Sequence, residues 1–262
     1  MKAIVVDLAR CNGCFNCQIA CKDEHCGNDW SPIAKPEPET GSFWCRVDQR
    51  ERGKVPVVKV AYTPRFFDCD EELLAAAPEC VYEREDGIVI IDPEKAVGRR
   101  DLADAYEGIY WNAEYDIPQK CTMCAHLLDG GWDAPRCVDA CATDALRFGD
   151  IESFGNELED AFRFCEGSRF YYLNMPKRWI AGSVVDREAN EVLIGARVFV
   201  FDRTGKRVAA LTTDEFGDFK EERFDEAPYV VRIEADGYEP VELQADCTRE
   251  DVVLGDIFMV AK

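Results

Sequence analysis

The residues of this 262-residue chain best suited to chemistry are its 14 cysteines. One run has the spacing C-x₂-C-x₂-C-x₃-C and consists of Cys11, Cys14, Cys17 and Cys21. This spacing is found in bacterial proteins that bind two [4Fe–4S] clusters, where three thiolates bind one cluster and the fourth binds the other. The run therefore predicts iron–sulfur chemistry, and it requires a second set of cysteines elsewhere in the chain.

A second set near the middle of the chain supplies the reciprocal ligands, namely Cys121, Cys124, Cys137 and Cys141. In the pairing we expect, the first cluster is bound by Cys11, Cys14, Cys17 and Cys141. The second cluster is bound by Cys121, Cys124, Cys137 and Cys21.

Other metal sites explain these runs less well. Zinc also binds C-x₂-C pairs, but it rarely uses three cysteines in C-x₂-C-x₂-C with a fourth after x₃. A Rieske centre needs two histidine ligands in matched motifs, and the only histidines, His25 and His126, do not provide them. Two histidines with these neighbours also give no nucleophile and base pair, so we expect no catalytic residue in this chain.

Six further cysteines lack ligand spacing, and we expect them to be buried free thiols. They are Cys26, Cys45, Cys69, Cys80, Cys165 and Cys247.

The charge of the chain limits its partners. It has 31 Lys and Arg against 52 Asp and Glu, a formal net charge of −21. Such a chain repels phosphate backbones and anionic lipid, so nucleic acid and membrane surfaces are poor partners. No stretch approaches the ~18–20 apolar residues of a membrane span, and Asp7 interrupts the apolar start. We expect a cytoplasmic protein; the alternative is export in the folded state with a catalytic subunit that carries a twin-arginine signal.

The elements that position the cysteines are few and short. We expect helices over residues 70–77 and 157–164, a buried strand over 88–91 and a proline-rich loop over 31–38. Irregular chain of this kind builds little apolar core, so metal–thiolate bonds are expected to stabilise it.

The composition changes late in the chain. From Trp179 onward there is one cysteine, and six or seven short apolar stretches alternate with turns, as is typical of a β-sandwich. We therefore expect an α+β protein with a ferredoxin-like iron–sulfur domain over residues 1–175 and a β-sandwich domain over residues 176–262.

Longer stretches carry a resemblance to a known family, namely residues 11–30, 46–53, 82–95 and 119–129. They resemble the iron–sulfur subunits of pyrogallol–phloroglucinol transhydroxylases and molybdenum catechol dehydroxylases, which belong to the DMSO reductase family. The resemblance implies a large partner subunit that carries a molybdenum bis-pterin cofactor and acts on a phenolic hydroxyl group. It also implies that the sandwich is similar to transthyretin-like, carboxypeptidase-regulatory and Cna-B-like domains and serves for docking or packing.

The sequence departs from the transhydroxylase subunit where the latter holds a third cluster. Here residues 63–69 contain only Cys69, and Ala105 stands where a later cysteine should be. Cys69 and Cys80 cannot alone form a four-thiolate cage, so we expect two clusters and no third.

These features predict an electron-transfer subunit whose two [4Fe–4S] clusters exchange electrons with a molybdopterin catalytic subunit, in a heterodimer or larger complex. The alternatives are a self-standing ferredoxin-type carrier with an adhesin-like structural domain, and an interaction module in which the metal is purely structural.

Overall fold

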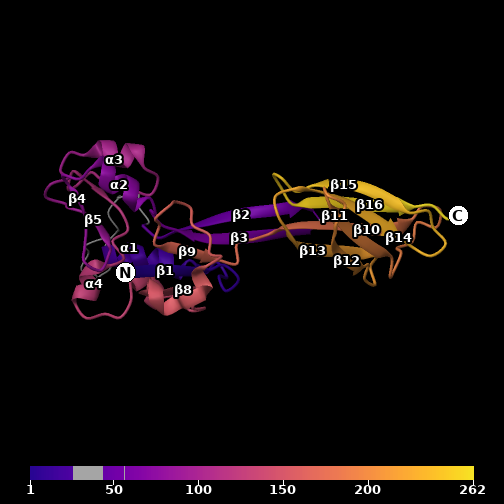
Figure 1. The fold of residues 1–262 in the computed structure, drawn as a ribbon, viewed down its shortest axis with the longest axis horizontal. Helices are drawn as coiled ribbons and strands as arrows, with labels where there is room; N and C mark the ends of the chain where they lie inside the picture. The colour runs from indigo at the N-terminus through magenta and orange to yellow at the C-terminus, as the bar shows by residue number, and fades with distance from the viewer. Residues whose placement is uncertain (26–43, 56) are drawn as a thin grey trace, which may run out of the picture. The chain divides into compact units, whose positions relative to one another are not determined.

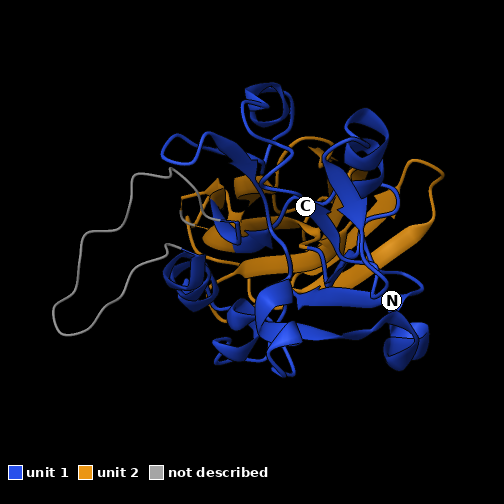
Figure 2. Cartoon of the chain, turned by 90° about the vertical axis from the view of Figure 1, so that its left-hand side faces the viewer, with its two compact units in different colours: residues 1–49, 62–175 blue, residues 50–61, 176–262 orange. Residues whose placement is uncertain are grey.

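The computed structural model describes residues 1–25, 44–55 and 57–262. Two compact units divide the chain (Figure 2). Unit 1 comprises residues 1–49 and 62–175, and unit 2 comprises residues 50–61 and 176–262. Residues 50–61 therefore belong with the second unit, while the expected boundary at residue 175 stays a prediction about which segments fold alone. Cys26 and the proline-rich segment 31–38 lie outside the described residues.

Unit 1 contains a three-stranded sheet in the order β8-β1-β9 (Figure 1). β1 (Lys2–Asp7) pairs antiparallel with β8 (Leu146–Asp150) and parallel with β9 (Phe170–Leu173). The four apolar residues 3–6 of β1 are fully buried, as expected for a central strand covered on both faces. The first cysteine run follows β1 after a short turn, so the sheet fixes where that run begins.

The remaining elements of unit 1 are short. The helices are α1 (Asn16–His25), α2 (Asp70–Ala76), α3 (Arg100–Ala105), α4 (Ala125–Asp129), α5 (Arg136–Asp139) and the 3₁₀ helix η1 (Ile151–Leu158). Two hairpins pair β4 (Val81–Glu83) with β5 (Val89–Ile91) and β6 (Tyr110–Asn112) with β7 (Ile117–Gln119). A third pairs β2 (Arg46–Lys54) with β3 (Val57–Arg65) and is divided between the two units. α2 and β5 confirm the helix and the buried strand expected in these regions.

The helix expected over residues 157–164 is wrong. The segment 151–158 is a 3₁₀ helix broken at Gly155, whose φ of 54° and ψ of −136° are not helical. Beyond it, Phe162 and Tyr172 exchange two backbone hydrogen bonds of 2.9 and 2.8 Å. This bridge draws Phe162 to β9 and prevents it from continuing a helix.

Unit 2 is the expected β-sandwich. One sheet has the order β13-β10-β16 and the other has the order β12-β11-β14-β15. The strands are β10 (Arg178–Asp186), β11 (Arg197–Asp202), β12 (Arg207–Thr212), β13 (Asp218–Phe224), β14 (Pro228–Glu234), β15 (Val241–Asp246) and β16 (Val252–Met259). Inward-facing residues alternate with outward-facing ones, and buried Val198, Val231 and Ile257 from both sheets share one core. The seven strands therefore confirm the alternating pattern read from the sequence.

A buried ion pair joins residues 50–61 to the rest of unit 2. The Arg52 guanidinium binds both carboxylate oxygens of Asp251 at 3.0 and 2.6 Å. The side chains of Arg52 and Asp251 are 8% and 2% exposed. Arg52 also donates to the carbonyl oxygen of Lys177 at 2.7 Å and lies 4.8 Å from the Trp179 ring. The hairpin tip is thus an integral part of the sandwich unit.

Among the described residues, no helix has both the length and the apolar character needed to cross a membrane.

Replacing Arg52 by Met should destabilise unit 2 by about 3–5 kcal/mol, because the Asp251 carboxylate would stay buried without its cation. Lys54→Met is the matched control, since Lys54 pairs with Glu250 at 3.3 Å on the exposed surface of the same hairpin. That pair should contribute about 1 kcal/mol or less. Chemical denaturation of the full chain measures both, and equal effects of the two substitutions would contradict the role assigned to Arg52.

Candidate functional site

The first cysteine run is held by a tight loop followed by α1. Gly13 has a φ of 70°, and a Cβ atom there would lie 2.5 Å from the Tyr62 ring, so only glycine fits. α1 then carries Cys17 and Cys21 four residues apart, which places both on one helix face, and both are buried. Loop and helix together present thiols in two directions.

The structure brings Cys141 to the first three cysteines. Burial raises the pKa of the Cys11 thiol, and the neighbouring thiols of Cys17, Cys141 and Cys14 raise it further. All four also line one cavity beside Pro64 and Leu146. The backbone N–H of Leu146 lies 3.4 Å from Cys141 Sγ and donates to it.

The second set gathers around Cys21. Burial raises the pKa of Cys21, and the nearby thiols of Cys137, Cys121 and Cys124 raise it further. Burial also raises the pKa of Cys124 to about 12. The structure thus brings Cys21 close to Cys121, Cys124 and Cys137.

Local backbone geometry shapes the second set. Met123 and Cys124 have φ values of 48° and 50°, a left-handed pair that costs energy in non-glycine residues and turns the chain sharply. Within this turn the Met123 N–H donates to Cys121 Sγ at 3.4 Å. Such strained turns are expected where several thiols must converge on one point.

A buried ion pair anchors the start of the second set. Lys120 Nζ lies 2.9 Å from Asp70 Oδ1 and donates to the carbonyl oxygens of Val89 and Cys121 at 2.7 and 3.1 Å. Both charged side chains are buried. Lys120 therefore ties the backbone of Cys121 to α2 and β5.

The donor sets fit iron–sulfur clusters. Each contains four thiols in or beside a mostly buried core, and backbone N–H groups donate to sulfur in both sets. A metal removes the thiol protons that burial otherwise retains, so binding is coupled to proton release. Hydrogen bonds to the sulfur atoms are also one of the means by which proteins set cluster potentials.

Cys45 is a functional candidate that sequence reasoning missed, because no ligand spacing marks it. Its side chain is fully buried and hydrogen-bonds with Cys137 and Cys17, one member of each set. These bonds raise the pKa of Cys45, and the same contact lowers the pKa of Cys17. Cys45 therefore lies between the two sets, where its thiol can donate a hydrogen bond, and its backbone N–H also bonds to Cys21.

The prediction of buried free thiols is correct for some of the other cysteines and wrong for others. Cys80 and Cys247 are buried free thiols, as expected, and each lies in an apolar core. Cys69 and Cys165 are only partly buried and form a disulfide, so the expectation of free thiols there is wrong. The thiols approach because α2 and the segment before β9 meet, a contact between distant segments that spacing does not reveal.

The two histidines lie beside the second set. His25 Nε2 is 3.5 Å from Cys124 Sγ, and its ring packs on Trp44. Burial lowers the pKa of His25 to about 4. His126 pairs with Glu24 at 2.9 Å on the surface.

The region that resembles a third cluster site forms a cavity of about 270 Å³. Both segments expected there line it, residues 65–69 and residues 105–108. Cys69 is the only cysteine among its described lining residues, and aromatic rings and the side chains of Arg46 and Arg65 occupy much of the wall.

Comparisons with known proteins agree with this architecture. Residues 59–151 match the family described as 4Fe-4S dicluster domain, and residues 179–256 match the carboxypeptidase regulatory-like domain. The first match includes the second cysteine set. Together with the seven-stranded unit 2, these matches confirm the expected fold class.

Similar proteins are iron–sulfur subunits of oxidoreductases. The chain is 38% identical to the pyrogallol hydroxytransferase small subunit of Pelobacter acidigallici, over 89% of this chain and 90% of that protein. It is 31% identical to a subunit of the tetrathionate reductase of Salmonella typhimurium, over 57% of this chain and 58% of that protein. It is 30% identical to a subunit of the sulfite dehydrogenase of Allochromatium vinosum, over 62% of this chain and 73% of that protein.

Replacing Cys45 by Ala should leave the iron content unchanged and lower the reduction potentials. One lost hydrogen bond of about 1 kcal/mol corresponds to about 40 mV for a one-electron couple. EPR-monitored redox titration of the holoprotein measures this shift. Cys80→Ala is the control, since Cys80 is a buried thiol in a separate core. Loss of iron, or unchanged potentials, would contradict the donor role of Cys45.

Proposed function

Because the chain belongs to the family of the pyrogallol hydroxytransferase small subunit, we propose that it is a non-catalytic electron-transfer subunit of a molybdenum enzyme. The observation that carries this proposal is the reciprocal arrangement of two four-cysteine sets in unit 1. A single structural metal would need only one such set.

The proposed ligands follow the two sets. One [4Fe–4S] cluster is bound by Cys11, Cys14, Cys17 and Cys141. The other is bound by Cys121, Cys124, Cys137 and Cys21. The proximity of the four thiols within each set supports this assignment.

Bound clusters of this type supply reversible one-electron chemistry. The residues of the chain hold the sulfur atoms, keep most of them away from water and donate hydrogen bonds to them. Cys45 contacts a member of each set, so it is placed to influence both clusters together.

The partner is proposed to be a large subunit that carries a molybdenum bis-pterin cofactor and acts on phenols of the catechol or pyrogallol type. This inference rests on the relative that matches most of the chain. All substrate chemistry would then occur in that subunit. We propose a reducing compartment for the complex, because Cys45, Cys80 and Cys247 are buried free thiols outside the two cluster sets.

Two clusters are proposed rather than three. The cavity at the place of the third site offers one described cysteine, whereas a cluster needs four ligands. About eight irons per chain are therefore expected.

Replacing Cys141 by Ser should damage the cluster bound by the first run, although Cys141 lies in the second run along the sequence. The EPR spectrum of this variant should lose the same signal as that of Cys14→Ser. Cys21→Ser should instead match Cys124→Ser, and Cys247→Ser should change neither signal. If Cys141→Ser and Cys124→Ser affected the same cluster, the reciprocal assignment would be wrong.

Co-expression with the large molybdenum-binding subunit of the same organism tests the function as a whole. We expect a stable complex that contains molybdenum, and reduction of the clusters when the catalytic subunit receives electrons. A stable monomer that shows no affinity for the large subunit would favour a self-standing carrier. Clusters that take up no electron reversibly would favour a structural role.

A further inference from the structure

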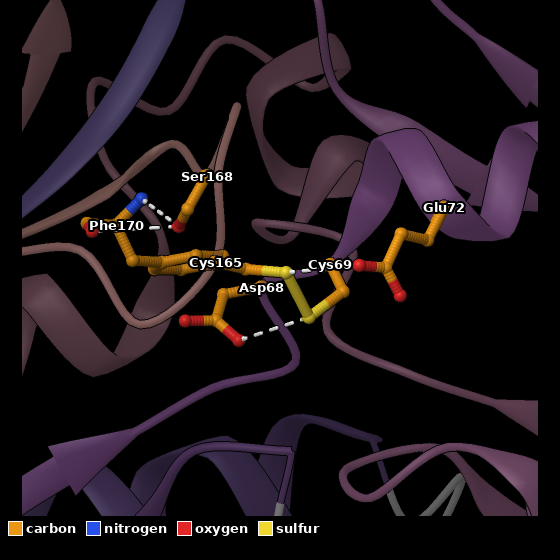
Figure 3. The surroundings of a disulfide bond; sticks show 6 residues. All are labelled: Asp68, Cys69, Glu72, Cys165, Ser168 and Phe170. Atoms are coloured by element: carbon orange, nitrogen blue, oxygen red, sulfur yellow. Dashed lines mark hydrogen bonds between the residues drawn. A yellow bond between two sulfur atoms is a disulfide. The ribbon is translucent and has the colours of Figure 1, made fainter.

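Cys69 and Cys165 form a pair that the cluster assignment does not use. They lie 96 residues apart in sequence, with their Cα atoms 5.4 Å apart, and the structure records them as a disulfide (Figure 3). Cys69 immediately precedes α2, and Cys165 lies in the segment before β9. The pair therefore joins two distant parts of unit 1.

Two carboxylates face the sulfur atoms from opposite ends of the pair (Figure 3). Glu72 Oε1 lies 3.9 Å from Cys165 Sγ, and Asp68 Oδ1 lies 3.9 Å from Cys69 Sγ. One donor atom from each of Cys69, Glu72 and Cys165 falls within 4.8 Å of the other two. Two sulfur atoms and one carboxylate oxygen thus lie close together, and Asp68 borders them on the side of Cys69.

The Asp68 carboxylate is not satisfied by the protein. Asp68 is 6% exposed, and its Oδ2 atom is buried with no hydrogen-bond partner among the described residues. Arg65 is a nearby cation that lowers the pKa of Asp68, but burial outweighs it and raises that pKa. This oxygen is not the one that faces Cys69, which is Oδ1, so Asp68 borders the three donor atoms without being one of them.

A disulfide does not satisfy these carboxylates. Neither sulfur of a disulfide carries a hydrogen, so the contacts of Asp68 and Glu72 with sulfur contain no donor. In the dithiol form, a divalent cation could bind Cys69, Cys165 and Glu72 together. Two thiolates with oxygen ligands in tetrahedral geometry suit Zn²⁺.

We propose that Cys69, Cys165 and Glu72 bind one Zn²⁺ ion when the two cysteines are reduced, with water as the fourth ligand. Each thiol gives up one proton on binding, and no electron is transferred. Formation of the disulfide removes two electrons and two protons from the dithiol, so the disulfide and the zinc site exclude each other.

The surrounding structure supports a rigid site. Glu72 is three residues after Cys69, which places it on the same side of the first turn of α2. On the other segment, Ser168 Oγ accepts from the Phe170 N–H at 3.1 Å and holds the turn after Cys165. Asp68 and Cys69 also line the cavity of about 270 Å³, which gives the ion a route to the site.

The metal content of the full-length chain tests the proposal. The protein is purified without oxygen and without chelators, supplied with Zn²⁺, desalted and analysed for zinc and iron. We expect one zinc per chain beside the cluster iron. Zinc X-ray absorption should give two Zn–S distances of about 2.3 Å and two Zn–O distances of about 2.0 Å.

Variants separate this site from the clusters. Cys69→Ser together with Cys165→Ser should abolish zinc binding and leave the iron content unchanged, whereas Cys247→Ser should retain both metals. Glu72→Gln should weaken zinc binding by at least ~10-fold.

Two results would overturn the proposal. One is a Cys69–Cys165 disulfide, detected by peptide mapping, that persists in anaerobically purified protein lacking zinc. The other is that the double variant loses iron, while the wild-type protein contains iron but no zinc. Cys69 and Cys165 would then be ligands of a cluster.

Discussion

The proposed cluster assignment places one constraint on unit 1, which is that two distant cysteine runs exchange a ligand. Cys21 meets the second set and Cys141 meets the first, so neither set of four is complete within its own segment. Few long helices or sheets hold this part of the chain together. With clusters bound, metal–thiolate bonds would therefore cross-link α1 to the segment around α5, and metal binding and folding would be one equilibrium.

The remaining features of unit 1 bring these two segments into position. The central strand β1 sets the start of the first run, and the Lys120–Asp70 ion pair fixes the backbone before Cys121. A buried ion pair is weak evidence for stability in itself, because desolvation offsets much of its attraction. Its contribution here is positional, since Lys120 binds carbonyl oxygens from two separate segments at once.

The two cysteine runs could be recognised in the sequence because their spacing is local and chemically specific. The same holds for the sandwich, where alternating residues and turns repeat along consecutive strands. Cys45 and the Cys69–Cys165 pair could not be found this way, because each depends on segments that meet only in three dimensions. The helix prediction for residues 157–164 was wrong for a related reason. The backbone hydrogen bonds between Phe162 and Tyr172 join residues that are distant along the chain, and the local sequence does not reveal them.

Residues 50–61 show a further limit of reading along the chain. Their sequence lies between two segments of unit 1, yet Arg52 completes the charge balance of Asp251 in unit 2. A sandwich cut at residue 176 would keep its seven strands and lose this cation. The Asp251 carboxylate also accepts from the Trp179 backbone N–H at 3.2 Å, so its environment bears on the start of β10. One part of the β2–β3 hairpin therefore belongs to each unit. As a result, neither unit is encoded by one continuous segment of the chain.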